Sequence, residues 1–359
     1  MAAAPLVTVI MPAYNARAYI EHSVSSVLEQ TFRDLVLWVV NDGSTDDTAE
    51  ILQYLASKDD RLKVLTVPNG GPAKARNIAL DQADPGTQFF MFLDADDVLL
   101  PGAIQYALTG AGGEDATFVT ETGTGQPADL TLFGFSIVSV DGTQRDYFEP
   151  AQSLTRDDLG PHLARLYKAN LLNQVWGKLL HADLIQAHSI RFQDCRWGED
   201  RLFLFDCLDH AQTIEVLPAC QYHYLMHPGE SLITRFYDQK FAICCQIDQR
   251  MEALCQDLGV TDQAAFRYMF VKSVYSCLTT LFARSCPLTR QEKRAYIQEI
   301  ITNPQVQRRC RDASGGRTIQ MLCRALQSGS VSRVYRTARS MALAGRLLPG
   351  LFLRIKHRK

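Results

Sequence analysis

The sequence predicts an α/β protein with a Rossmann-like sheet, mixed but mainly parallel, flanked by helices. Four short apolar runs, at 7–11, 35–40, 62–67 and 88–93, alternate with segments of helical periodicity at 16–30, 46–57 and 71–83. This βαβαβαβ order implies right-handed crossovers between parallel strands. The fourth run is apolar at every position from Phe89 to Leu93, as expected for a strand that is buried on both faces.

The remainder of the chain predicts a few more strands and then mostly helices. A Gly- and Thr-rich stretch at 111–128 indicates a surface loop, residues 130–137 alternate like a strand, and Asp141-Gly142 supplies a hairpin turn. We expect 154–180 to be mostly helical, 214–217 and 222–226 to be short strands, and 236–301 to form long helices broken at Pro287. The predicted regions are therefore an α/β body (1–235), a helical C-terminal appendage (236–329) and a basic amphipathic tail (330–359).

The composition is that of an ordinary globular protein. Of 359 residues, 47% are hydrophobic and 21% charged, which excludes a disordered chain. Ten cysteines show no CxxC spacing, so we expect reduced thiols in the cytoplasm rather than a disulfide framework. The first apolar run follows Pro5 with no basic segment before it, which predicts a strand and not a signal peptide.

Two acidic motifs carry the strongest functional signal. Asp94-Ala95-Asp96-Asp97 follows the buried fourth strand, at the sheet edge where open α/β folds bind ligands, and Glu199-Asp200 follows Trp197-Gly198. Carboxylate oxygens suit Mg²⁺ or Mn²⁺ bridging a diphosphate, and a separate carboxylate can act as a base. The alternative is purely structural, because such residues also form turns, cap helices and complement the helix dipole.

The other strand ends carry compatible groups. The first is followed by Met11-Pro12-Ala13-Tyr14-Asn15, which exposes an aromatic ring and an amide, and the second by Asn41-Asp42-Gly43-Ser44-Thr45, with an acceptor and helix-capping hydroxyls. The segment from Asn69 to Asn77 places glycines and cations before a helix. Together these loops predict a pocket for an anionic nucleotide, although each one alone could be a capped turn.

These motifs resemble those of the family 2 glycosyltransferases, which are inverting enzymes with the GT-A fold. The similarity covers roughly residues 5–235 and rests on Pro12-Ala13-Tyr14-Asn15, Asn41 to Asp46, Ala75-Arg76-Asn77 and Leu93 to Asp97. Val175-Trp176-Gly177-Lys178-Leu179 and Gly198-Glu199-Asp200 are similar to the acceptor-side signature of capsule, exopolysaccharide and teichoic-acid sugar transferases. The resemblance implies a nucleotide-sugar donor, often UDP-linked, a glycan or lipid-linked glycan acceptor, and Mg²⁺ or Mn²⁺.

The resemblance also implies a role for each matching residue. Pro12 and Tyr14 would line the base site with Asn15 beside them, Asp42 would bond the uracil, Arg76 would lie beside base and phosphate, Asp94 would face the ribose, Asp96 would bind the metal, and Asp200 would be the base. Two departures stand out. Asn41 replaces a common aspartate, which bears on nucleotide preference, and Gly177 replaces a frequent asparagine, which bears on acceptor contacts.

Further residues are candidates for diphosphate or acceptor contacts. His227, Ser231 and Arg235 lie in a segment that resembles the family's closing element over the donor diphosphate. Trp197 is a candidate sugar platform or a core residue, and Glu199 accompanies the predicted base. In the implied reaction Asp200 takes the proton of an acceptor hydroxyl, and attack from the opposite face inverts the anomeric carbon. The rival function is a non-catalytic sugar-nucleotide-binding module of the same fold.

The C-terminal tail is strongly basic. From Ala313 onward there are ten Lys/Arg and no Asp/Glu, although the formal net charge of the whole chain is −2. Basic residues alternate with apolar ones over 330–359, which favours an anionic membrane surface at the inner face of the cytoplasmic membrane; the alternative is a solvated helix packed on the catalytic body. No uncharged apolar stretch reaches the ~18 residues of a spanning helix, and no nucleic-acid partner is expected.

Overall fold

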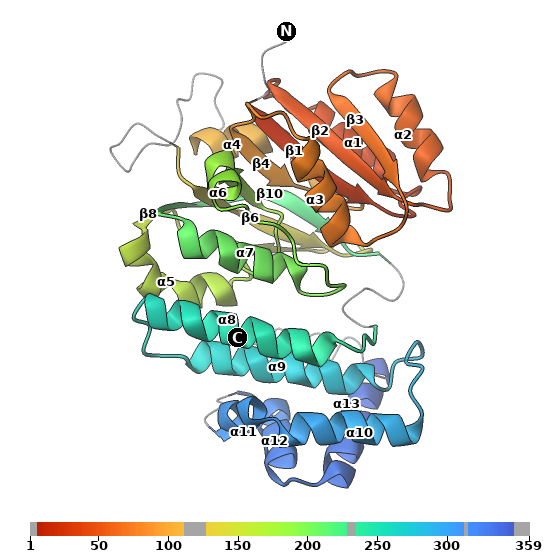
Figure 1. The fold of residues 1–359 in the computed structure, drawn as a ribbon, viewed down its shortest axis with the longest axis vertical. Helices are drawn as coiled ribbons and strands as arrows, with labels where there is room; N and C mark the ends of the chain where they lie inside the picture. The colour runs from red at the N-terminus through yellow and green to blue at the C-terminus, as the bar shows by residue number, and fades with distance from the viewer. Residues whose placement is uncertain (1–5, 111–126, 228–234, 312–314, 348–359) are drawn as a thin grey trace. The chain divides into compact units, whose positions relative to one another are not determined.

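The computed structural model of the protein describes residues 6–110, 127–227, 235–311 and 315–347 (Figure 1). The chain divides into an N-terminal unit, residues 1–228, and a C-terminal unit, residues 229–359. The described part of the N-terminal unit is α/β, and that of the C-terminal unit is helical. The predicted loop at 111–128 falls almost wholly outside the described residues.

The N-terminal unit is built on one mixed sheet, with ten strands among the described residues. Its parallel part consists of β1 (Val7–Ala13), β2 (Leu35–Asp42), β3 (Leu62–Val67) and β4 (Phe89–Phe92), in the spatial order β3-β2-β1-β4. The sheet continues through β9 (Lys178–His181), β6 (Leu130–Val138), β10 (Thr213–Leu225) and β5 (Val98–Leu99). Two edge strands, β7 (Gln144–Tyr147) and β8 (Gln152–Thr155), pair with β6 and β10. The predicted fold class is confirmed.

Helices cover both faces of the parallel part (Figure 1). On one face, α1 (Ile20–Leu28) contacts α2 (Thr48–Ala56), and on the other, α3 (Pro72–Gln82) packs against β1 and β2. From β3 the chain returns past β2 and β1 to form β4 on the far side of β1. This connection runs in the opposite direction to the earlier ones, so a right-handed crossover places its helix, α3, on the opposite face of the sheet. Proline at the first position of α3, after Gly71 with φ 91°, fixes where this helix begins.

Two predictions in the middle of the chain are wrong in detail. The segment 154–180 is helical only in α5 (Arg156–Lys168), because Asn170 and Gly177 adopt positive φ and Leu179 and Leu180 are buried as part of β9. The two short strands expected at 214–217 and 222–226 form the single strand β10, whose register shifts between Leu217 and Tyr222. The hairpin at Asp141-Gly142 is confirmed, since β6 and β7 pair on either side of it.

Three shorter helices complete the described N-terminal unit. They are α4 (Ala103–Thr109), α6 (Ala182–Ala187) and α7 (Glu199–His210). The last of these begins at the second acidic motif. Its apolar residues Phe203, Leu204 and Phe205 are fully buried and anchor the motif to the core.

The described C-terminal unit contains six helices. They are α8 (Lys240–Asp257), α9 (Ala264–Thr280), α10 (Arg290–Thr302), α11 (Pro304–Arg311), α12 (Arg317–Gln327) and α13 (Val331–Leu347). The predicted break at Pro287 is confirmed, and α10 begins at a capping box in which Thr289 and Glu292 bond each other's backbone N–H. Arg309, 3% exposed, joins α11 to α8 through Asp248 at 2.9 Å.

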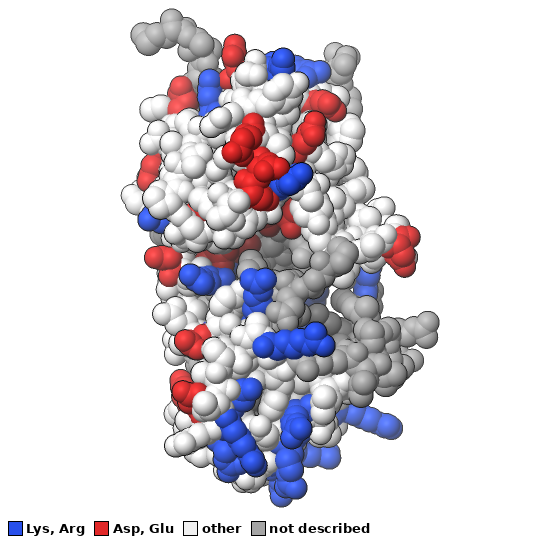
Figure 2. Space-filling model, turned by 90° about the vertical axis from the view of Figure 1, so that its right-hand side faces the viewer, with Lys and Arg blue, Asp and Glu red and all other residues white. Residues whose placement is uncertain are grey.

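Much of the basic tail predicted from the sequence is the helix α13. Val334, Ala338 and Met341 are buried, and α13 packs against α9, α10 and α12. The apolar side of this helix is therefore covered by other helices of the C-terminal unit, whereas the alternative expected from the sequence placed it on the catalytic body. Residues 348–359 lie outside the described part. On the face of this unit seen in Figure 2, Lys and Arg gather with few Asp or Glu. No described helix is long and apolar enough to span a bilayer.

Candidate active site

Three carboxylates from two distant parts of the chain meet at one guanidinium. Arg76 on α3 donates from Nη2 to Asp94 Oδ1 at 2.8 Å, and from Nη1 to Asp200 Oδ1 at 2.8 Å and Glu199 Oε1 at 3.2 Å. Asp94 follows β4, whereas Glu199 and Asp200 form the first turn of α7. The two acidic motifs are thus brought together at the carboxyl edge of the sheet.

Arg76 is almost completely buried, with 3% of its surface exposed. Burial alone would lower its pKa, but the charges of Asp200, Asp94 and Glu199 outweigh this and raise it. Its guanidinium carbon lies 5.3 Å from the ring centre of Phe192, which stacks on Phe203. The cation is therefore fixed between an aromatic layer and three carboxylates, and losing it would leave buried negative charges uncompensated.

Asp200 is held by several groups and still reaches solvent. Its carboxylate accepts a hydrogen bond from the backbone N–H of Val175 in addition to the one from Arg76. Burial raises the pKa of Asp200 and Arg76 opposes the rise, with a net upward shift. The side chain keeps 19% exposure. A positioned carboxylate of raised pKa that touches solvent is suited to accept a proton from a bound hydroxyl.

Glu199 has a different electrostatic environment from its neighbour. Burial, followed by the charge of Asp200, raises the pKa of Glu199 to about 7, while Arg76 opposes the rise. Its side chain is 11% exposed. Glu199 therefore changes its charge near neutral pH, directly beside the predicted base.

Lys178 feels the charge of Asp200, and the sequence placed it in the acceptor-side motif without assigning it a role. It is 1% exposed, and its Nζ donates to the carbonyl oxygen of Trp176 at 3.0 Å. Burial lowers the pKa of Lys178 to about 7, and the nearby charge of Asp200 acts in the opposite direction. The segment from Val175 to Lys178 thus supplies Asp200 with both a backbone donor and a nearby cation. The available signals were its place in that motif and the leucines that follow it at 179 and 180.

The Asp-rich turn after β4 is fixed by its last residue. Asp97 is fully buried; its Oδ2 accepts the hydroxyl of Tyr222 at 2.6 Å and its Oδ1 accepts the N–H of Leu225 at 2.8 Å. The ring of Tyr222 stacks on Trp176 with centroids 4.3 Å apart. Asp97 therefore ties the turn to β10 and leaves Asp94 and Asp96 at its open side.

Asp96 is the candidate metal ligand and is half exposed. The Nε2 of His227 lies 3.8 Å from its Oδ2 and 3.2 Å from its carbonyl oxygen, while the His227 ring stacks on Tyr19 with centroids 3.9 Å apart. Oxygen and imidazole ligands fit Mn²⁺ or Mg²⁺. Among the described residues no group of three or more His, Cys, Asp or Glu could hold a metal unaided, so a cation at Asp96 would need oxygens of a bound diphosphate.

Hydrogen bonds join the loops after β1 and β2. Asn15, at φ 49°, accepts the N–H of Thr45 at 2.8 Å and donates its own N–H to Ser44 Oγ at 3.0 Å. Tyr14 beside it is 52% exposed, as an open stacking surface requires, and Pro12 lies opposite Val40 in the sheet. The two loops that carry the residues predicted to bind the nucleobase are thus held together by hydrogen bonds.

Asp42 orders the loop that leads to Arg76. Its two carboxylate oxygens accept the N–H groups of Gly70 at 2.7 Å and Gly71 at 2.8 Å, and the residue is 4% exposed. Each carboxylate oxygen has a second lone pair, so bonding to a base is compatible with this structural role.

Three further residues were predicted to contact the diphosphate or the acceptor. Trp197 is partly exposed one residue before the positive-φ Gly198, and Arg201 covers its ring at 5.1 Å. Ser231 lies outside the described residues. Arg235 belongs to the C-terminal unit and is exposed. Contacts of Ser231 and Arg235 with a donor stay predictions.

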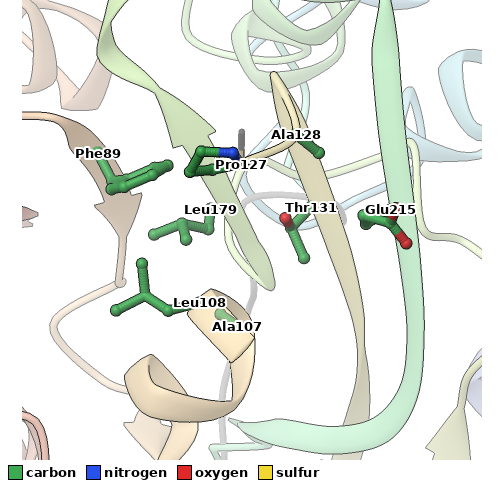
Figure 3. A pocket seen from close by; sticks show the side chains of 8 residues that line it. All are labelled: Phe89, Ala107, Leu108, Pro127, Ala128, Thr131, Leu179 and Glu215. Atoms are coloured by element: carbon green, nitrogen blue, oxygen red, sulfur yellow. The ribbon is translucent and has the colours of Figure 1, made fainter. Parts of the chain in front are cut away.

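A small cavity lies near the start of β4, at the opposite end of that strand from Asp94 (Figure 3). Its volume is about 10 Å³, room for about one water molecule. It is lined by Phe89, Ala107, Leu108, Pro127, Ala128, Thr131, Leu179 and Glu215. This cavity cannot hold a nucleotide or a sugar.

Residues 8–152, which include β1 to β4 and the Asp-rich turn, match the family model described as Glycosyl transferase family 2. This part of the chain is similar to a family 2 glycosyltransferase domain. The predicted resemblance is therefore confirmed, although the family model ends before Glu199 and Asp200.

Individual glycosyltransferases are also similar to this chain. It is 29% identical over 230 residues to the uncharacterized glycosyltransferase EpsJ of Bacillus subtilis (strain 168), covering 63% of this chain and 62% of EpsJ. Over 102 residues it is 40% identical to the GalNAc(5)-diNAcBac-PP-undecaprenol beta-1,3-glucosyltransferase of Campylobacter jejuni, covering 28% of this chain and 32% of that one. The matches thus span less than two thirds of these relatives.

A solved structure shares the fold. The crystal structure of S. aureus TarS 1–349 in complex with UDP-GlcNAc superposes with a TM-score of 0.63 at 20% identity, and the match covers 94% of this chain and 92% of TarS 1–349. The predicted GT-A fold with a helical C-terminal region is confirmed.

Proposed function

We propose that this protein transfers a sugar from a nucleotide-sugar, UDP-linked, to a hydroxyl of a glycan or lipid-linked glycan, with inversion at the anomeric carbon. The observation that carries the proposal is the convergence of Asp94 and Asp200 on Arg76. Arg76 thus joins Asp94, predicted to face the donor ribose, to Asp200, the predicted base. Both carboxylates lie at the carboxyl edge of the sheet, where open α/β folds bind ligands.

In this reaction Asp200 accepts the proton of the acceptor hydroxyl as its oxygen attacks the anomeric carbon. Arg76 and the N–H of Val175 keep the carboxylate oriented, and its raised pKa increases its strength as a base. The C–O bond to the diphosphate breaks as the new glycosidic bond forms, so an α-linked donor gives a β-linked product.

The donor would occupy the surface formed by the loops after β1 and β2. Exposed Tyr14 offers a face for the base, and Asp42 and Asp94 offer acceptors for the base and the ribose. The crystallised TarS relative binds UDP-GlcNAc, which supports a UDP-sugar as the first donor to test. A divalent cation bound at Asp96 would supply positive charge to the departing diphosphate.

The acceptor proposal rests on hydroxyl chemistry and on one relative. A phosphate acceptor needs no base to remove a proton, whereas Asp200 is positioned as one. The Campylobacter jejuni relative is named for an undecaprenol diphosphate-linked glycan and a β-1,3 linkage. A lipid-linked glycan of a cell-surface polysaccharide is therefore the acceptor class that we propose.

A donor screen tests the function directly. UDP-, GDP-, CDP- and dTDP-sugars are incubated with the protein, Mn²⁺ and lipid-linked or free oligosaccharides, and nucleotide release is measured. Turnover with a UDP-sugar is expected, and the coupling constant of the product's anomeric proton should report a β linkage. UDP-sugar binding without turnover by any acceptor class would instead favour the non-catalytic module, and an α-linked product would contradict inversion.

A further inference from the structure

The helices α12 and α13 together form an outer surface that carries arginines and no carboxylate. Residues 317–344 contain Arg317, Arg324, Arg333, Arg336 and Arg339, all exposed, and no Asp or Glu. Among the described residues none of the five has a carboxylate partner, in contrast to Arg308 and Arg309 on α11, which pair with Glu252 and Asp248. We call these five residues the cationic surface.

The geometry of the two helices directs these arginines to one side. On α12, Ile319, Leu322 and Leu326 are buried, and on α13, Val334, Ala338 and Met341 are buried. The helices contact each other and both pack on α9. Because both bury their apolar stripes in the same helical core, the arginine-bearing stripes opposite them face outward together.

Two apolar side chains are exposed on the same outer stripes as the arginines. Met321, on the outer stripe of α12, is 48% exposed, and Leu343, on that of α13, is 45% exposed. Arg294 from α10 extends the positive charge, since its Nη2 donates to Ser332 Oγ at 3.1 Å on the same side of α13 as Arg336. The face of this unit in Figure 2 shows the gathering of Lys and Arg.

From this we infer that the cationic surface docks the protein on a membrane that contains anionic lipids. Clusters of four to eight basic residues on a helical surface attract anionic headgroups, and exposed Met and Leu side chains suit the headgroup boundary. Since the apolar stripes of both helices are already buried, binding is electrostatic and requires neither unfolding nor insertion of α13. The sequence-based expectation placed membrane contact on the amphipathic tail at 330–359, whereas this surface includes α12 and keeps the apolar side of α13 buried.

The apolar side chains exposed near the arginines favour a lipid surface over a soluble polyanion as the partner. A sugar polymer would favour aromatic platforms, but Tyr335 on α13 packs against Phe282 with ring centres 5.1 Å apart and is only partly exposed. The large apolar side chains exposed on this surface are instead Met321 and Leu343, which lie among exposed Gln and Ser residues. The inference is independent of the proposed function, since it involves no residue of the candidate active site.

The test is flotation of the full chain with vesicles of phosphatidylcholine, with and without phosphatidylglycerol. Binding only to the anionic vesicles is expected, with release near 1 M salt, where the Debye length falls to about 3 Å. A triple variant, Arg333→Gln, Arg336→Gln and Arg339→Gln, should lower vesicle affinity by about 100-fold, at roughly fivefold for each arginine. The matched control, Lys58→Gln, Lys63→Gln and Lys168→Gln, makes the same charge change at exposed sites of the N-terminal unit and should bind within about twofold of wild type.

Three results would overturn the inference. The first is equal loss in the control, which would make binding a matter of net charge. The second is full binding by the triple variant combined with complete loss when residues 345–359 are deleted, which would assign binding to the last residues of the chain. The third is triple-sensitive binding to soluble polyphosphate without vesicle binding, which would indicate a polyanionic polymer. A far-UV spectrum and melting curve of each variant show that it is folded.

Discussion

Replacing Lys178 by methionine is expected to stabilise the protein in a pH-dependent manner. Burial lowers the pKa of Lys178 from 10.5 to about 7, so folding disfavours its protonated form. Each pKa unit corresponds to about 1.36 kcal/mol. Below pH 7, burying the protonated Lys178 therefore lowers the free energy of unfolding by at most about 5 kcal/mol. The lost hydrogen bond to Trp176 costs about 1 kcal/mol at every pH.

The sign of the pH dependence follows from the direction of the shift. Between pH 7 and 10.5 the unfolded chain binds a proton that the folded protein does not, so wild-type stability rises with pH across this window. The advantage of Lys178→Met is therefore expected to fall from at most about 4 kcal/mol at pH 6 to about 1 kcal/mol at pH 9.

Urea denaturation of the variant and of wild type at both pH values measures this difference. Lys63→Met is the control, because Lys63 is exposed on β3 and its substitution should have a small effect that is the same at both pH values. Two results would refute the reasoning that burying the Lys178 ammonium destabilises the protein. One is a Lys178→Met protein that is less stable than wild type at pH 6, and the other is the same difference in the free energy of unfolding at pH 6 and pH 9.

Three further predictions concern the carboxylates. Asp200→Asn should lower kcat by about 10²–10⁴-fold while UDP affinity in calorimetry stays within about twofold, and near-normal turnover would exclude Asp200 as the base. Arg76→Met should lower the free energy of unfolding by about 3–5 kcal/mol at pH 7. Arg76 opposes the upward pKa shifts of Glu199 and Asp200, so both carboxylates stay protonated to higher pH in the variant. The loss in the free energy of unfolding should therefore be smaller at pH 5 than at pH 7, and a loss that does not change with pH would indicate a packing effect. Asp96→Asn should weaken Mn²⁺-dependent UDP binding by at least about tenfold and leave metal-free binding unchanged, and equal losses in both would remove Asp96 as the metal ligand.

The parallel half of the fold could be predicted from the sequence because local patterns determine it. The runs that became β1 to β4 are apolar and short, and Pro72 and Gly71 mark the start of α3. In contrast, β9 was missed because Lys178–His181 has no alternation of its own. It is a strand because β4 and β6 offer free edges on either side, which depends on segments far away in the sequence.

The site could be predicted in its residues but not in its connections. The motifs singled out Arg76, Asp94 and Asp200, yet no spacing indicates that one guanidinium binds carboxylates 18 and 124 positions away. Lys178 was missed for a related reason, because its pKa shift comes from tertiary burial and lysines are ordinarily exposed. The metal-binding role of Asp96 stays a prediction.

The bonds made by Arg76 also bear on when a newly made chain becomes competent. Asp200, the proposed proton acceptor, cannot be oriented by Arg76 until α7 has docked beside α3, and these helices are separated by most of the sheet in chain order. If the proposed roles hold, a nascent polypeptide that has folded only through β4 would bind the donor without catalysing transfer. Appearance of sugar transfer during refolding should coincide with the last cooperative step of the N-terminal unit and not with the recovery of UDP binding.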